Sequence, residues 1–277
     1  MSLRSRFAET ALFGMLLATV FCSGSALCRA EANKTPIVEQ IYWHGFVSQS
    51  FILTDENEFL GSSSDGSFKF SSAGLGALWQ PMDSVQLSIQ GLYKQIGNSS
   101  PKGTQLDYAI LDWAMVDEFD YGLGFRVGRL MNPYGFFNET RDVAATRPSL
   151  LLPESVYIDY LQFLFRSSDS VGLYMRRELS EGTFSFNANF GKPLLTDEAT
   201  HAILGGLPGR TAGGNLVSEE FFALQLRYED ASGKWRSALS YGWFAADYRA
   251  APDDILADAR VDFKHLMLSL EYSLDDF

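Results

Sequence analysis

The amino-acid sequence predicts an all-β protein that forms an antiparallel transmembrane β-barrel. Three observations lead to this prediction. About ten segments alternate between apolar and polar residues, these segments approach the length of a tilted membrane strand, and the connectors between them alternate between long and short. A soluble β-sandwich also alternates, with polar side chains toward water, but it has no reason to gather its tight turns at one end.

The alternation predicts ten strands, at residues 39–54, 67–79, 84–96, 104–116, 119–131, 168–178, 182–191, 217–229, 234–247 and 260–274. The long connectors are residues 55–66, 97–103, 132–167, 192–216 and 248–259. The short connectors are residues 80–83, 117–118, 179–181 and 230–233, and each of them is shorter than every long one. The short turns are expected to face the periplasm and the long loops the outside.

Two segments show the alternation clearly. In 182–191, Phe184 and Phe190 fall on one face and Asn187 on the other. In 260–274, leucines at even positions oppose polar residues at odd positions. Segments 67–79 and 104–116 are less regular, and the sequence does not fix their register. Tyrosine and tryptophan residues collect near strand ends, where they are expected to form interfacial girdles.

Residues 1–32 have the properties of a secretory signal peptide. Arg4 and Arg6 precede a short apolar run, and small residues follow it, with cleavage expected after Ala26 or Ala32. The alternative is an uncleaved membrane anchor. With the signal peptide removed, residues 33–277 would form a single outer-membrane barrel domain in a Gram-negative cell.

The composition excludes several classes of function. Cys22 and Cys28 are the two cysteines of the chain, and both lie in the predicted signal peptide, so the mature protein would have no disulfide, cysteine metal site or cysteine nucleophile. Removing residues 1–32 takes away three basic and two acidic side chains and changes the formal net charge from −12 to −13. This acidic balance argues against nucleic acid as a partner. No metal or other cofactor is expected.

The connector 132–167 is the longest, and it carries the candidate functional residues. It is rich in apolar residues and contains three prolines, so we expect it to be ordered. Its charged residues are candidates for a pore constriction: Glu139, Arg141, Asp142, Arg147, Glu154 and Asp159. Opposed charges across a narrow water channel sort solutes by charge. The alternative is that these charges pair with one another and pin the loop against the wall.

The polar strand faces give a second set of candidates. If the registers hold, six basic residues point into the lumen: Lys69, Lys94, Arg126, Arg176, Arg227 and Arg236. Glu229 and Glu271 are the main acidic residues expected on the same faces. A basic lumen would favour anions despite the acidic total charge. The alternative is that these are ordinary solvated side chains of a wide pore.

Several motifs resemble a family of porin-like Gram-negative outer-membrane proteins. The motifs are GRLMNPYGFFNETRD at 128–142, TRPS at 146–149, LPESVY at 152–157, GFVSQS at 45–50 and DGSF at 65–68. The resemblance covers roughly residues 40–190 and is weaker beyond. It implies a porin-type barrel, a long loop folded into the lumen, passive diffusion of small hydrophilic solutes, contact with outer-membrane lipid and a homotrimer. It does not name a solute.

Two other classes of function stay open. A non-conducting barrel could serve adhesion or structure through the loops 132–167 and 192–216. An outer-membrane hydrolase could use His201 with Asp197 or Glu198, although the chain lacks the sequence motifs of nucleophilic, metal-dependent and phosphate-binding enzymes. The chain is therefore not expected to be an enzyme.

The last residues bear on whether the barrel closes. Phe277 falls out of step with the apolar positions of 260–274 and follows two aspartates. We therefore expect a truncated chain, about six strands short of a sixteen-stranded barrel, in which a long loop would have room to fold inward. The alternative is a complete ten-stranded barrel, since barrels of even strand number from eight upward are known.

Overall fold

A computed structural model gives the fold of the chain. It describes residues 40–54, 64, 66–96, 103–143, 146–148, 152, 157, 165–195, 214–252, 254 and 256–274. All of these belong to one compact unit, Val38–Phe277. The predicted signal peptide, residues 1–32, lies outside the described residues.

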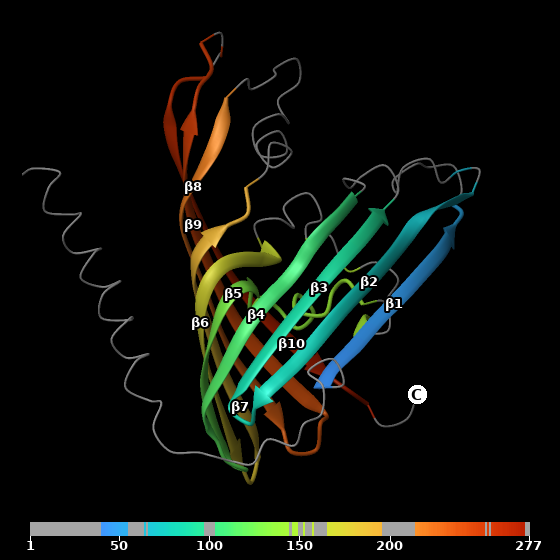
Figure 1. Ribbon diagram of the computed structural model, residues 1–277, viewed down its shortest axis with the longest axis vertical. Coiled ribbons are helices and arrows are strands. Elements are labelled where there is room, and N and C mark those ends of the chain that lie inside the picture. The colour runs from blue at the N-terminus through green and yellow to red at the C-terminus, as the bar shows by residue number, and fades with distance from the viewer. Residues whose placement is uncertain are drawn as a thin grey trace, which may run out of the picture. The chain divides into compact units, whose positions relative to one another are not determined.

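Ten antiparallel strands form a single sheet, and each strand pairs with its neighbours in sequence (Figure 1). The strands are β1 (Ile41–Ile52), β2 (Ser67–Met82), β3 (Val85–Ile96), β4 (Gly103–Asp117), β5 (Tyr121–Met131), β6 (Ser167–Leu179), β7 (Gly182–Pro193), β8 (Asn215–Asp230), β9 (Trp235–Arg249) and β10 (Ala259–Tyr272). The all-β prediction and all ten predicted strands are confirmed. No helix among the described residues is long and apolar enough to cross a membrane.

The connectors alternate in length as predicted, with tight turns after β2, β4, β6 and β8. The turns differ from the predicted bounds by a residue or more, and the turn after β2 is the clearest case. The prediction placed it at residues 80–83, but β2 continues to Met82 and pairs there with Val85, so that the turn is Asp83 and Ser84. A register shift between Trp79 and Met82 allows the strand to continue through Pro81, which cannot donate to the sheet.

Register shifts explain why two segments were irregular in the sequence. The β1–β2 register shifts between Ser50 and Ile52, and the β3–β4 register shifts between Gln90 and Gly91. An extra residue on one strand breaks the period-two alternation locally. At the second shift, Asp107 is the extra residue of β4, and it is buried.

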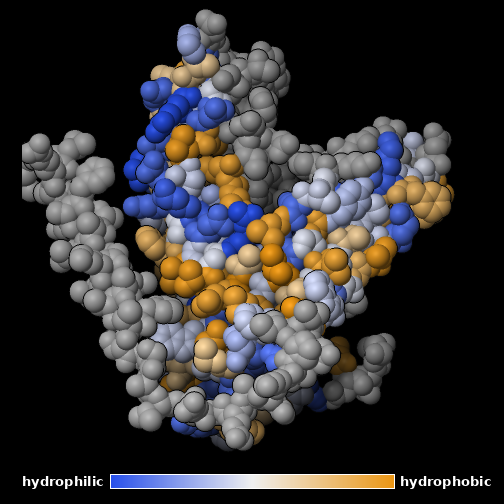
Figure 2. Space-filling model, viewed as in Figure 1, coloured by the Kyte–Doolittle hydropathy of each residue, from blue (hydrophilic) through white to orange (hydrophobic). Residues whose placement is uncertain are grey.

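The two faces of the sheet differ in polarity. The outer face exposes large apolar side chains, among them Leu266, Leu268 and Leu270 of β10, which are 68, 65 and 57 % exposed. Other members are Leu75, Ile89, Leu111, Trp113, Val127, Val171, Phe184, Phe190, Leu226 and Leu239. Figure 2 shows apolar residues gathered across the middle of the visible face. Such a surface is unusual for a protein face in contact with water.

The opposite, inner face carries polar and charged side chains over most of the strands. On β3, for example, Gln90 and Lys94 are buried on this face, with Leu92 between them. Near the long-connector ends of β8 and β9, the inner face becomes apolar, and Phe221, Phe244 and Tyr248 form a buried cluster there. The polar part of the inner face is therefore bounded by an apolar end.

Strands β1 and β10 are the two edges of the sheet, because neither pairs with the other among the described residues. The sheet is open and compatible with a β-barrel. It curves enough for one segment, between β5 and β6, to contact β3 through Lys94 and β10 through His265. We call this segment, residues 132–166, the inner connector.

Candidate functional site

The inner connector folds back on itself at its base. The backbone N–H of Asn132 donates to the carbonyl of Arg166 at 2.8 Å. The Asn138 amide donates to the carbonyls of Asn132 and Phe165, each at 2.8 Å. Asn138 is buried, so these bonds satisfy carbonyls that water cannot reach. Asn138 thus closes the base of the loop.

Gly135 attaches the connector to β8 and β9. Its N–H donates to the hydroxyl of Ser240 at 3.1 Å, and its carbonyl accepts from the Gln225 amide at 2.7 Å. Gly135 has φ +59°, in the left-handed region that favours glycine. A side chain here would also meet the hydroxyl of Tyr157. Glycine is required by both the backbone and the close contact.

Aromatic residues fill the space between the connector and the far wall. The Tyr157 hydroxyl accepts from the N–H groups of Phe136 and Phe137 at 3.0 and 3.1 Å. Tyr134 stacks on Phe165, with ring centroids 5.3 Å apart, and its hydroxyl bonds the His265 ring on β10. Burial raises the pKa of Tyr134 to about 12, so its hydroxyl stays protonated at neutral pH.

A buried charged cluster attaches the connector to β3 and β4. The Lys94 ammonium lies 3.0 Å from the Asp142 carboxylate. Arg166 approaches the carboxylates of Asp142 at 3.7 Å and Asp107 at 3.6 Å. All four side chains are buried. We call these four residues the anchor cluster.

The anchor cluster keeps Asp142 ionised. Burial raises the pKa of Asp142, but the charges of Lys94, Arg166 and Arg141 outweigh burial and hold it at about 2. Removing one member of a buried ion pair leaves an uncompensated charge, and this is strongly destabilising. The cluster is therefore expected to contribute to the attachment of the connector.

The predicted constriction residues separate into two groups. Arg141 and Asp142 are each only 4 % exposed, and Arg141 donates to the carbonyl of Tyr157 at 3.3 Å. Asp142 holds the loop against the wall, as the alternative interpretation proposed, but its partners are Lys94 on β3 and Arg166. Arg141 instead bonds another part of the loop. Glu139 is exposed and Arg147 is half-buried. Glu154 and Asp159 lie outside the described residues.

Five of the six predicted lumen-facing basic residues lie on the inner face. Each has an acidic partner, in the pairs Lys94–Asp142, Arg126–Asp112, Arg176–Glu178, Arg227–Glu229 and Arg236–Glu271. Lys69 is a correction. The register shift in β1–β2 leaves Phe68 and Lys69 both opposite Phe51, so the exposed Lys69 is out of phase with the inner-face positions that begin at Phe70.

Arg227 and Arg236 also contact the inner connector. The Arg236 guanidinium lies 4.5 Å from the ring centroid of Phe136 and 5.4 Å from that of Phe137, and Arg227 lies 5.7 Å from Phe136. Cation–π contacts of this kind are worth about 0.5–1 kcal/mol at exposed sites. Part of the predicted basic lumen is thus occupied in holding the loop.

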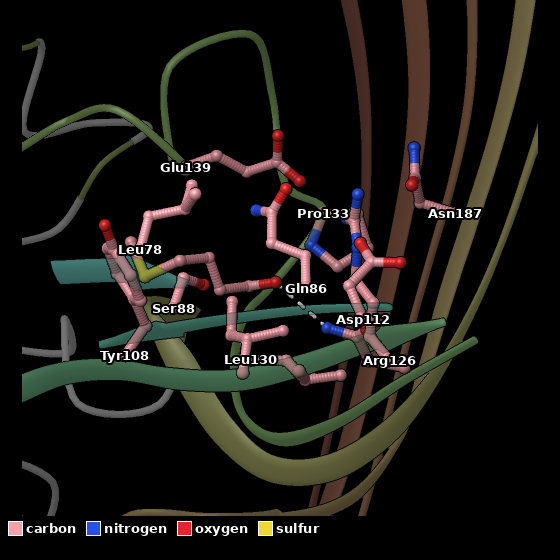
Figure 3. Close-up of a pocket in the computed structure, with 13 residues that line it drawn as sticks. Leu78, Gln86, Ser88, Tyr108, Asp112, Arg126, Leu130, Pro133, Glu139 and Asn187 are labelled. Carbon is pink, nitrogen blue, oxygen red and sulfur yellow. Dashed lines mark hydrogen bonds and ion pairs between the residues drawn. The ribbon is translucent and has the colours of Figure 1, made fainter. Parts of the chain in front are cut away.

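A cavity of about 270 Å³ lies between the connector and the strand wall. Figure 3 shows Glu139 reaching from the connector, with Gln86, Arg126 and Asp112 on the wall opposite. Glu139 is in contact with solvent, yet it lies within the sheet's concavity. Desolvation by the surrounding protein raises the pKa of Glu139, while the charges of Arg126 and Arg227 lower it.

Several residues of this site were missed at the sequence level. Arg166 and Asp107 belong to the anchor cluster. Asp107 was missed because it lies in β4, where the alternation is irregular, and Arg166 was missed because it lies at the end of the predicted connector 132–167. Tyr157 and Asn138 act through backbone contacts that no pattern of charge reveals. One feature could have been suggested by the sequence: a glycine between two bulky residues, Tyr134 and Phe136, is consistent with the positive φ of Gly135.

The histidines form no metal centre in the described structure. Within the ranges that the structure describes, no three His, Cys, Asp or Glu side chains lie close enough together to hold a metal ion. His44 bonds Gln90 and Tyr108 on the inner face, and His265 bonds Tyr134. His201, Asp197 and Glu198, the alternative hydrolase residues, lie outside the described residues.

Comparisons with family models, with curated proteins and with solved structures find no significant match to this chain.

Proposed function

We propose that the chain forms the wall of an outer-membrane pore that gives passive diffusion of small hydrophilic solutes. The sheet would meet lipid with its outer face and water with its inner face. The inner connector would narrow the water-filled space. The predicted signal peptide would direct the protein to the outer membrane of a Gram-negative cell.

The observation that carries the proposal is the contrast between the two faces together with the position of the connector. Leucine and aromatic side chains are exposed along the outer face of the strands, where water would be unfavourable and lipid is not. Charged and amide side chains cover most of the inner face, and the connector attaches to that face through hydrogen bonds and ion pairs. A soluble sheet would bury its apolar face instead.

The ion pairs bear on selectivity. A row of unpaired basic residues would favour anions, but each inner-face arginine has a carboxylate within 3.2 Å. Paired charges set up local fields across the space without a large net potential. We therefore propose that the pore has weak charge selectivity. Its preference for anions should be smaller than the one expected from the basic residues alone.

Conductance in planar bilayers tests the proposal. The full chain is folded into lipid, folding is checked by heat-modifiable migration on a gel, and the currents are recorded. We expect discrete channel openings and swelling of liposomes in small neutral sugars. Folded, heat-modifiable protein that gives neither current nor swelling would favour a non-conducting barrel that acts through its loops.

Charge variants test the assigned positions. Arg176→Glu, on the inner face and without a contact to the inner connector among the described residues, is expected to shift the ratio of cation to anion permeability toward cations. Arg177→Glu is the matched control, because Arg177 lies on the outer side of the sheet and pairs with Asp120 in the turn between β4 and β5. Arg141 is unsuitable for this purpose, since it is buried and its reversal would disturb the attachment of the connector.

A further inference from the structure

The cavity beside Glu139 has the composition of a binding site. Its lining comes from the inner connector and from strands β2 to β5 and β7, so groups distant in the sequence converge on one space. A volume of about 270 Å³ holds roughly nine water molecules at about 30 Å³ each. This is room for a small organic solute. The question is which chemistry the lining would select.

Among the charged groups of the lining, Arg126 and Asp112 pair with each other, and Glu139 is influenced by the charges of Arg126 and Arg227 without forming an ion pair with either. Arg126 donates to Asp112 at 2.8 Å, and the Tyr174 hydroxyl donates to the other oxygen of the same carboxylate at 2.8 Å. The Arg126 guanidinium also lies over the Tyr174 ring, 4.4 Å from its centroid. These contacts give each member of the ion pair a partner. Glu139 has no hydrogen bond or ion pair within the part of the chain that the structure describes.

Uncharged polar groups surround Glu139. The amides of Gln86 and Asn187 and the hydroxyl of Ser88 line the cavity, and none of the three side chains has a hydrogen bond among the described residues. In Figure 3, the Gln86 amide and the Glu139 carboxylate point into the same space. Amides and hydroxyls offer both donors and acceptors, so they suit a solute that carries hydroxyl or amide groups.

Apart from Tyr108 and Asn189, the remaining lining is apolar. Ile110, Leu130 and Pro133 line the cavity, and Leu130 is only 1 % exposed. Binding sites for small molecules commonly combine an apolar lining with a few polar groups that fix orientation. A short carbon chain would contact these residues while its polar ends reach Glu139 and the amides.

We propose that this cavity binds a small hydrophilic solute that carries an ammonium group, with the Glu139 carboxylate as its counter-charge. The site deepens the proposed function, because it names the class of solute that the pore would retain. An anion would meet two carboxylates, Asp112 and Glu139, and an arginine that is already paired. An ammonium group would meet an unpaired carboxylate with amide oxygens beside it.

A charge series on the unsubstituted full chain tests the proposal. The probes are 5-aminopentanol, 1,5-pentanediol and 5-hydroxypentanoate, which have similar length and carry charges of about +1, 0 and −1 at neutral pH. Binding to the chain folded in lipid nanodiscs is measured by titration calorimetry or by ligand-observed NMR. We expect 5-aminopentanol to bind at least about tenfold more tightly than the diol, and the anion most weakly. Equal binding of the three probes would overturn the proposal.

Two variants locate the site. Glu139→Gln keeps the size of the side chain and is expected to remove the advantage of 5-aminopentanol over the diol. Glu271→Gln is the matched control, because Glu271 is also on the inner face but lies outside the cavity and pairs with Arg236. It is expected to leave that advantage unchanged. Retention of the advantage in Glu139→Gln, or its loss in Glu271→Gln alone, would contradict the assignment.

The binding measurement and the conductance measurement fail separately. Channels that conduct but bind the three probes equally would remove the ammonium site and leave the pore. Charge-selective binding that depends on Glu139, without conductance in a folded chain, would keep the site and remove passive diffusion. Heat-modifiable migration of each variant shows whether it is folded before binding is compared.

Discussion

A single buried carboxylate, Asp142, joins the inner connector to β3 and pairs with Arg166, which makes the contact with β4. Its oxygens face the Lys94 ammonium on β3 and the Arg166 guanidinium, which also approaches Asp107 on β4. Exposed ion pairs contribute little to stability because water screens them. Asp142 differs because its partners are buried with it, and each of them depends on its charge.

Asp142→Asn is expected to destabilise the folded chain strongly. The substitution keeps the size of the side chain but removes the ion-pair partner of Lys94 and leaves Arg166 with Asp107 alone; loss of one partner costs about 3–5 kcal/mol in comparable buried pairs. Asp169→Asn is the matched control, because Asp169 pairs with Arg129 but is 56 % exposed. Its cost should stay below about 1 kcal/mol. Urea unfolding in lipid measures both, and equal losses would contradict the role of the anchor cluster.

The low pKa of Asp142 predicts a dependence of stability on pH. The pKa is about 2 in the folded protein and 3.8 in its ordinary state, so the unfolded chain takes up the proton at a higher pH. The contribution of Asp142 is therefore complete above about pH 4 and is lost as the pH falls from about 4 to about 2. The free energy of unfolding of the unsubstituted chain and of Asp142→Asn should converge over this window. Parallel curves would show that Asp142 does not titrate as described.

At the scale of elements, the inner connector is held by contacts on opposite walls. Lys94 and Asp107 hold it on β3 and β4, and Gln225 and Ser240 hold it on β8 and β9. Much of the far attachment passes through Gly135, whose N–H and carbonyl are both bonded. The position of the connector thus depends on a backbone conformation as well as on charge.

Gly135→Ala is expected to loosen the far attachment. A left-handed conformation costs a non-glycine residue about 1–2 kcal/mol, and the added Cβ would also displace the Tyr157 hydroxyl. Gly233→Ala is the control, since Gly233 also has a positive φ, 71°, but open space at its Cβ position. Urea unfolding should show a larger loss for Gly135→Ala. Equal losses would mean that the contact with Tyr157 contributes nothing.

Strands and connectors could be predicted well from the sequence, and the contacts of the connector could not. Period-two alternation reports which face a residue occupies, as Phe184, Leu226 and Arg227 show. It fails where an extra residue enters a strand, and this is why Lys69 was misplaced and Asp107 was overlooked. The charge of Asp142 was visible in the sequence, but its partners come from distant segments, and local patterns do not report such pairings.

At the scale of the whole molecule, the outer face is expected to contact lipid. Leu226 is half exposed on the outer face of β8. Leu226→Lys should reduce stable insertion by about 2–4 kcal/mol, the cost of a basic residue near the middle of a bilayer. Asn187→Lys is the control, because Asn187 pairs with Gln225, next to Leu226, and faces inward. Folding yield in lipid vesicles measures both, and equal yields would contradict a lipid-facing outer surface.

Water access to the inner face is tested most directly by the conductance of variants that each carry one introduced cysteine. Ser185→Cys faces inward between Arg176 and Arg227, and Leu226→Cys faces outward. A charged, water-soluble thiol reagent is added to the folded full chain in a planar bilayer, with the unsubstituted chain as reference. The reagent should lower the current stepwise in Ser185→Cys and leave Leu226→Cys unchanged. A folded chain without current, or a response in Leu226→Cys and none in Ser185→Cys, would contradict a water-filled pore on the inner face of the sheet.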